Sequence, residues 1–207
     1  MIKCPQLSVS EIKDDAKYEE ELDVISTNFA KEAGVPLKFL NATFQNTCNE
    51  ITDKVRNFCE KGKGVLVLSG SNGTGKTRTA SCAINHRLAN HLQGGIFISC
   101  KHDMCPLIRS SRSFRAEKSE LQVYKELYET PFLVLDDVGR GDDQIIAKAF
   151  IENVLSARYD NELPTLITTN FMMKDLCSYV GLDITSRFYE TAEVLVLAGA
   201  DRRKTHE

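Results

Sequence analysis

Residues 65–77 read VLVLSGSNGTGKT, a short apolar run followed by a glycine-rich segment of the pattern G-x-x-x-x-G-K-T. A helical pattern begins at Arg78, so the segment lies between a predicted strand and a predicted helix. Glycines let the backbone turn tightly and direct its N–H groups inward, and the N-terminus of the following helix adds a partial positive charge. We therefore predict a phosphate-binding loop that consists of Gly70, Ser71, Asn72, Gly73, Thr74, Gly75, Lys76 and Thr77.

Two residues of this loop have specific predicted roles. Lys76 is expected to reach the β- and γ-phosphates of a nucleoside triphosphate. Thr77 is expected to hold Mg²⁺, an ion that keeps several waters and takes few protein ligands. A glycine-rich turn before a helix is the alternative, but the strand, the spacing, the lysine and the threonine together favour phosphate binding. The sequence thus predicts ATP and Mg²⁺ as cofactors.

The composition is that of a folded, non-membrane protein. The chain has 207 residues, of which 42% are hydrophobic and 27% are charged, so one domain with an extension is expected. No apolar run approaches the ~20 residues that a membrane span needs. The first ten residues, MIKCPQLSVS, lack the apolar core of a signal peptide. We predict a cytoplasmic protein without membrane contact.

The charge is unevenly distributed along the chain. The net charge is −3, and residues 1–36 carry four Lys against eight Asp or Glu, so the remainder sums to +1. Residues 9–33 read as an acidic helix, either with a solvated charged face or with a docking role. We predict an acidic N-terminal helical extension over residues 1–36 and a core domain over 37–207. A chain so close to neutral would bind nucleic acid only through a local basic patch.

Apolar runs alternate with helical patterns through the core domain. This alternation is typical of an α/β fold in which a parallel sheet is covered by helices on both faces. The predicted sheet has five strands, near residues 65–69, 96–100, 132–135, 165–170 and 194–197.

Polar residues follow two of these predicted strands. Ligands of open parallel sheets bind beyond the carboxyl ends of the strands, where the glycine-rich loop also lies. Asp136 is expected to support Mg²⁺, and Asp137 to orient or activate an attacking water. Asn170 is expected to help position that water. The alternative is that the two aspartates cap the next helix.

The segments GSNGTGKT, FLVLDD, TLITTN and TSRF, in that order and spacing, resemble the AAA+ ATPases. Within them, the chain resembles the DnaC-type helicase loaders and the related IstB-type transposition ATPases. The lead-in AGVPLKFLNATFQN also resembles the segment before the phosphate-binding loop of that group. The resemblance covers about residues 33–203. It implies a P-loop AAA+ core without a C-terminal helical lid, ATP hydrolysis, and a role in loading a replicative helicase onto single-stranded DNA.

The resemblance also implies roles for individual residues. Asp137 stands where the family's catalytic Glu usually lies, and Asn170 where its sensor-1 residue lies. Arg187 resembles an arginine finger that reaches the nucleotide of a neighbouring subunit, which implies a homo-oligomer with head-to-tail contacts. Arg202 lies near the sensor-2 arginine. The alternatives are an ordinary surface arginine for Arg187 and a basic tail for Arg202. Because Asp is one methylene shorter than Glu, slow hydrolysis is expected.

A candidate contact region for single-stranded DNA follows the second predicted strand. Residues 101–118 carry five Lys or Arg against two acidic residues, a net of +3. Basic side chains around an aromatic ring are suited to single-stranded DNA. The alternative is a solvated loop whose aromatic residue packs in the core. The predicted DNA-contacting residues are Arg109, Arg112, Phe114 and Arg115.

Three other functions remain open at this point. The same ATPase core could assist a transposase, as in the IstB-type proteins. A P-loop nucleotide kinase would transfer phosphate to a small acceptor, although Asn170 and Arg187 argue against it. A switch that binds ATP without turnover is compatible with Asp137 in place of Glu.

Overall fold

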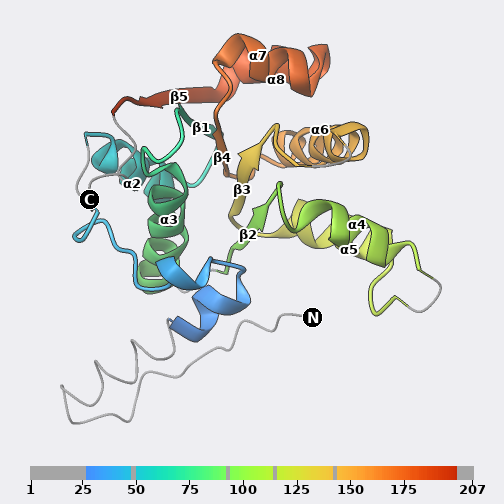
Figure 1. The fold of residues 1–207 in the computed structure, drawn as a ribbon, viewed down its shortest axis with the longest axis horizontal. Coiled ribbons are helices and arrows are strands. Elements are labelled where there is room, and N and C mark those ends of the chain that lie inside the picture. Colours follow the sequence, from blue (N-terminus) through green and yellow to red (C-terminus); the bar gives the residue numbers. More distant parts are fainter. Residues whose placement is uncertain (1–26, 48–49, 92–93, 114–115, 142–143, 200–207) are drawn as a thin grey trace.

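The computed structural model describes residues 27–47, 50–91, 94–113, 116–141 and 144–199, and its centre is a parallel sheet (Figure 1). The strand order is β2-β3-β4-β1-β5, and every neighbouring pair is parallel. This confirms the predicted five-stranded parallel sheet. The strands are β1 (Val65–Gly70), β2 (Ile96–Ser99), β3 (Leu133–Val138), β4 (Thr165–Thr169) and β5 (Ala192–Leu197).

Helices cover both faces of the sheet, as predicted. In Figure 1, α2 and α3 lie on one side of the strands and α4, α5 and α6 on the other, with α7 and α8 beyond α6. None of the described helices has both the length and the apolar character needed to cross a bilayer. The helical elements are η1 (Leu37–Phe39), α2 (Thr52–Lys61), α3 (Lys76–His91), α4 (Met104–Ser111), α5 (Glu120–Glu129), α6 (Gln144–Asp160), α7 (Met173–Val180) and α8 (Leu182–Thr191).

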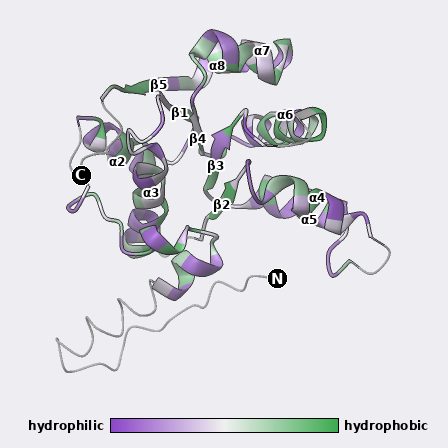
Figure 2. Ribbon diagram, in the orientation of Figure 1, coloured by the Kyte–Doolittle hydropathy of each residue, from purple (hydrophilic) through white to green (hydrophobic). Residues whose placement is uncertain are grey.

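The strands separate two hydrophobic clusters because successive side chains point to opposite faces. In β1, Leu66 and Leu68 belong to the cluster under α2 and α3. Val65 and Val67 belong to the cluster under α4, α5 and α6. Both faces of β1 are therefore buried, which explains why this strand begins with four consecutive apolar residues, Val65 to Leu68. Figure 2 shows hydrophobic character in β2 and in the first part of β3, whose end is hydrophilic.

The N-terminal side of the domain differs in detail from the prediction. The helical spacing of Ile51, Val55, Phe58 and Cys59 predicts a helix over about residues 47–61 with this face turned inward, but α2 begins at Thr52. Its predicted inward face is confirmed, since Val55 and Cys59 are fully buried. Ala33 is also buried, and its carbonyl accepts the Phe97 N–H at 2.7 Å.

Two expectations concern segments that the structure does not describe. Most of the predicted acidic helix over residues 9–33 falls there. So does the chain after Gly199, on which the predicted absence of a helical lid depends. The predicted boundary at residue 36 stays a prediction.

Candidate nucleotide-binding site

The glycine-rich loop connects the end of β1 to α3, which begins at Lys76. Gly70 has a φ of 151°, and a Cβ at this position would collide with the carbonyl oxygen of Leu197. Gly75 has a φ of 100°, a conformation that residues with a side chain rarely adopt. The backbone path from β1 to the N-terminus of α3 therefore requires glycine at these two positions.

Lys76 occupies the inside of this loop. Its side chain is buried, and Nζ donates hydrogen bonds to the carbonyl oxygens of Gly70 at 2.9 Å and Ser71 at 2.8 Å. The Thr74 hydroxyl donates to the same Ser71 carbonyl at 3.0 Å. Carbonyl oxygens therefore hold the ammonium group at the loop that is predicted to bind phosphate.

Asp136 lies at the same edge of the sheet and is 4% exposed. The Thr77 hydroxyl donates to its Oδ2 at 3.2 Å, and the Thr168 hydroxyl donates to its Oδ1 at 2.5 Å. A carboxylate beside a hydroxyl provides hard oxygen ligands, which suit Mg²⁺. The residues predicted to hold the metal are therefore in contact, and their chemistry fits the ion.

The electrostatics of Asp136 also fit a cation site. Burial raises the pKa of its carboxyl to about 6, and the nearby charge of Asp137 acts in the same direction. Hydrogen bonds from Thr168 and Thr77, and the charge of Lys76, act in the opposite direction. A divalent cation bound here would favour the ionised carboxylate.

Asp137 lies in a β-bulge, which the sequence analysis did not predict. The register of β3 against β4 shifts between Leu135 and Val138, where β3 contains one residue more than β4. Asp137 has a φ of 58°, in a region that Asp and Asn enter more readily than most residues. Its N–H donates to the Thr168 hydroxyl at 2.9 Å. A bulge redirects a side chain from the regular alternation, as often occurs beside active sites.

Asn170 follows β4 and contacts the glycine-rich loop. Its Nδ2 donates to Oδ1 of Asn72 at 3.0 Å. Its own Oδ1 is buried and has no hydrogen-bond partner within the part of the chain that the structure describes. Asn170 is thus beside the loop, with an amide oxygen that could accept a hydrogen bond from a water molecule.

Arg187 lies in a different environment, on α8 against α6. Its Nη1 donates to the carbonyl oxygen of Ser156 at 3.0 Å and to the Ser156 hydroxyl, and lies 3.5 Å from Oδ1 of Asp160. The guanidinium is 4.8 Å from the ring centroid of Tyr159. Arg187 therefore contacts α6 of its own chain and does not contact the described residues of the glycine-rich loop in the interactions given above.

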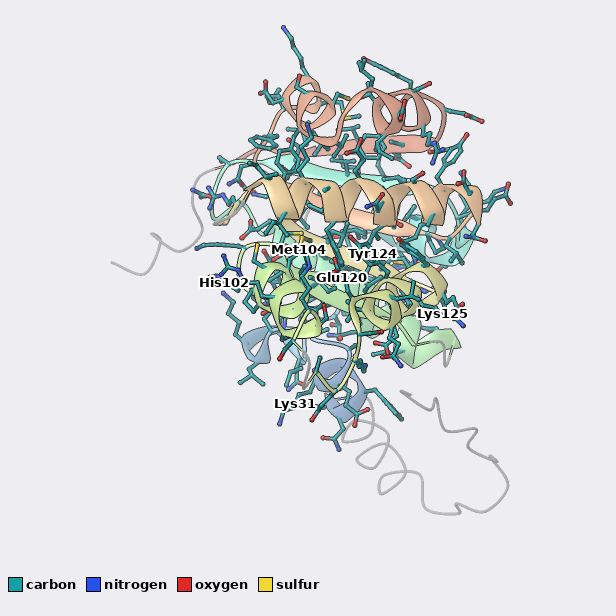
Figure 3. All side chains as sticks on the ribbon, turned by 90° about the vertical axis from the view of Figure 1, so that its right-hand side faces the viewer. Lys31, His102, Met104, Glu120, Tyr124 and Lys125 are labelled. Carbon is teal, nitrogen blue, oxygen red and sulfur yellow. The ribbon has the colours of Figure 1, made fainter. Side chains whose placement is uncertain are left out.

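Acidic residues from outside the basic segment pair with two of its cations. Arg109 is exposed on α4. Arg112 forms a two-pronged ion pair with Glu120, with both nitrogen–oxygen distances at 2.7 Å, and Lys118 pairs with Glu126 at 2.7 Å. Both acidic partners lie just beyond the segment whose charge was counted. Figure 3 views this side of the molecule, with Glu120 labelled. Phe114 and Arg115, also predicted to contact DNA, lie outside the described residues, and so does Arg202, which the resemblance places near the sensor-2 arginine.

Sequence reasoning missed the polar groups that connect these parts. Ser69 donates its hydroxyl hydrogen to the carbonyl oxygen of Phe171 at 2.7 Å, which ties the end of β1 to the residue after Asn170. Thr168 joins Asp136 to Asp137. The available signal for Thr168 was a polar residue near the end of a predicted strand, two positions before Asn170.

The pKa of Asp136 leads to a stability prediction. Because its folded-state pKa of about 6 exceeds the ordinary value of 3.8, the folded protein binds this proton more tightly than the unfolded chain does. The contribution of Asp136 to stability therefore falls as the pH rises from about 4 to about 6, by up to about 3 kcal/mol, and is constant above that range.

We expect Asp136→Asn to remove this penalty. In urea denaturation without nucleotide or divalent cations, its stability gain over the wild type should be about 1 kcal/mol larger at about pH 8 than at about pH 5. Asp53→Asn is the control, since the Asp53 side chain is 86% exposed. An equal gain from Asp136→Asn at both pH values would contradict the prediction.

No protein-family model matches the chain. The replicative helicase loader DnaC of Escherichia coli (strain K12) is 27% identical over 139 residues, which cover 65% of this chain and 55% of DnaC. The chain thus spans about half the length of the curated relatives it matches.

Solved structures extend the comparison to the fold. The crystal structure of the DnaC helicase loader has a TM-score of 0.65 at 25% identity, covering 79% of this chain and 100% of that chain. The replication initiator DnaA bound to AMPPCP and single-stranded DNA has a TM-score of 0.64 at 17% identity. The match covers 80% of this chain and 51% of the DnaA chain, and at this identity it shows similarity of fold alone. In both sequence and fold, this chain resembles the DnaC-type AAA+ ATPases.

Proposed function

We propose that this chain binds and hydrolyses ATP and helps to load a replicative helicase onto single-stranded DNA. One observation carries the ATPase part of the proposal. The glycine-rich loop, the Thr77–Asp136 contact and Asn170 meet at a single edge of the sheet. The similarity to DnaC, a replicative helicase loader by name, supports the replication part.

Nucleotide binding would use groups that are already positioned. The Lys76 ammonium would exchange the Gly70 and Ser71 carbonyls for phosphate oxygens. Backbone N–H groups of the loop and the N-terminus of α3 would bind the remaining phosphate charge. Thr77 and Asp136 would hold Mg²⁺, whose chemistry when bound is to neutralise charge on the phosphates.

Hydrolysis would depend on Asp137 and Asn170. The Asp137 carboxylate would orient the attacking water and accept its proton. Asn170 would turn its amide from Asn72 toward the terminal phosphate, and its unpartnered Oδ1 could accept a hydrogen bond from the water. The side chain of Asp137 would reach less far than a Glu, which supports slow turnover.

Arg187 would complete the site of a neighbouring copy. To do so it would exchange its contacts with Ser156 and Asp160 for the γ-phosphate of the adjacent subunit. A guanidinium at that position stabilises transition-state charge and is worth ~10³–10⁵ in rate. A head-to-tail contact of this kind builds rings or open spirals.

The DNA contact is proposed for the exposed side of α4. Arg109 is the exposed basic residue there, and Arg112 would have to exchange its pairing with Glu120 for a DNA phosphate. DnaA, which shares the fold, was solved with single-stranded DNA. The contact region would include Phe114 and Arg115.

The first prediction of this function concerns Asp137. Asp137→Asn should keep the left-handed backbone, because Asn also tolerates positive φ, but should lose the carboxylate. We expect ATP binding within a factor of about three of the wild type, and phosphate release lower by ~10²–10⁴. Binding is measured by fluorescence titration and turnover by a phosphate-release assay with single-stranded DNA and a helicase.

Asp175→Asn on α7 provides a control in which an aspartate outside the site is changed in the same way. Wild-type turnover by Asp137→Asn would exclude a catalytic role. A wild-type chain that binds ATP but never releases phosphate would instead favour the switch without turnover.

The second prediction tests whether Arg187 acts in a neighbouring subunit. Arg187→Ala retains its own loop and Asp137, whereas Asp137→Asn retains Arg187. Neither variant alone should turn over ATP, but an equimolar mixture should regain activity, because an Asp137→Asn subunit can supply Arg187 to an intact site. Phosphate release is measured for each protein and for the mixture.

A variant control separates this role from packing of α8 on α6. Ser156→Ala removes the hydroxyl that accepts from Arg187 but leaves the guanidinium, so it should retain turnover. A mixture that stays inactive, with both variants folded, would assign Arg187 to the contact with α6.

A further inference from the structure

Thr168 occupies an unusual place in β4. Side chains of a strand alternate between faces, so Thr168 follows Leu166 onto the face under α3, while Asp136 follows Val134 onto the same face. Leu166 pairs with Val134 in the register of these strands. The register therefore brings the Thr168 hydroxyl beside the Asp136 carboxyl, at 2.5 Å.

The hydroxyl has a single proton, which fixes the direction of its two hydrogen bonds. That proton is donated to Oδ1 of Asp136, so the oxygen lone pairs accept the N–H of Asp137 at 2.9 Å. The side chain is fully buried, so water does not compete for either bond. One hydroxyl thus orients a carboxylate and fixes the backbone of the bulged residue next to it.

The two oxygens of the Asp136 carboxylate therefore have different partners. Oδ1 is occupied by Thr168, whereas Oδ2 is turned toward the Thr77 hydroxyl on α3. The oxygen that faces α3 is the one available to a cation at the loop. Partners that orient a metal-binding carboxylate typically affect metal affinity or activity by ~10–100-fold.

We propose that Thr168 is a positioning residue of this site, which directs Oδ2 of Asp136 toward the cation and holds Asp137 in its bulge. This inference rests on the proposed ATPase function. It assigns Thr168 no contact with nucleotide. Loss of the Thr168 hydroxyl should therefore reduce the increase in nucleotide affinity that Mg²⁺ causes, and it should reduce turnover. It should leave nucleotide affinity in the absence of metal unchanged.

The test compares three variants of the 207-residue chain. Thr168→Val keeps the shape of the side chain and removes the hydroxyl, and Thr168→Ser keeps the hydroxyl. Thr165→Val is the matched control, because Thr165 is a buried threonine at the other end of β4, and its hydroxyl accepts from Arg158. Affinity for a non-hydrolysable ATP analogue is measured by calorimetry in EDTA and in Mg²⁺, and thermal unfolding is followed for every protein.

We expect Thr168→Val to bind the analogue normally in EDTA, and to lose ~10–100-fold of the affinity gain that Mg²⁺ gives the wild type. Turnover should fall with it. Thr168→Ser should restore both properties, and Thr165→Val should retain both even if its thermal stability falls.

Two results would overturn the inference, and they differ. If the wild type gains affinity with Mg²⁺ and folded Thr168→Val gains as much, Thr168 does not position the site. Thr168→Val could fail to fold, and the test then rests on Thr168→Ser, which retains the hydroxyl. A folded Thr168→Ser variant that loses ~10–100-fold of the affinity gain from Mg²⁺ would overturn the inference. A wild type that does not bind the analogue would reject the proposed function itself.

Discussion

The Asp136 carboxylate, buried between the hydroxyls of Thr77 and Thr168, is the interaction on which the site depends. It requires three elements to meet at one point: the end of β3, the end of β4 and the first turn of α3. A parallel sheet provides this meeting, because its strands all end at the same edge. The two hydrophobic clusters fix the register of the strands and hence the position of each polar group.

The residues that are placed for cation binding and catalysis in this arrangement lower the stability of the fold. An ionised carboxylate that is buried without a cation is unfavourable, which is why the pKa of Asp136 is raised to about 6. The left-handed conformation of Asp137 adds a further cost next to it. The apolar packing of the strands against α3 and α6 stabilises the fold that carries both costs.

The sequence was sufficient for what depends on local pattern. The strands, the loop and the acidic residues at the end of β3 were predictable because apolar periodicity and glycine spacing are written in consecutive residues. The bulge at Asp137 was not, since it depends on how β3 pairs with β4. The ion pair of Arg112 with Glu120 was also missed, because Arg112 at the end of α4 meets Glu120 at the start of α5 only in the folded chain, whereas the charge count stopped at residue 118. Thr168 could be recognised as a polar residue from the sequence, but its contact with Asp136 depends on the register of β4 against β3.

The central claim is that the loop binds ATP through Lys76, and one measurement tests it most directly. The affinity of the chain for ATP with Mg²⁺ is measured for the wild type, for Lys76→Ala, and for Lys63→Ala as a control at an exposed lysine. The account predicts binding by the wild type and by Lys63→Ala, with binding abolished in folded Lys76→Ala. Unaltered binding by Lys76→Ala would contradict it.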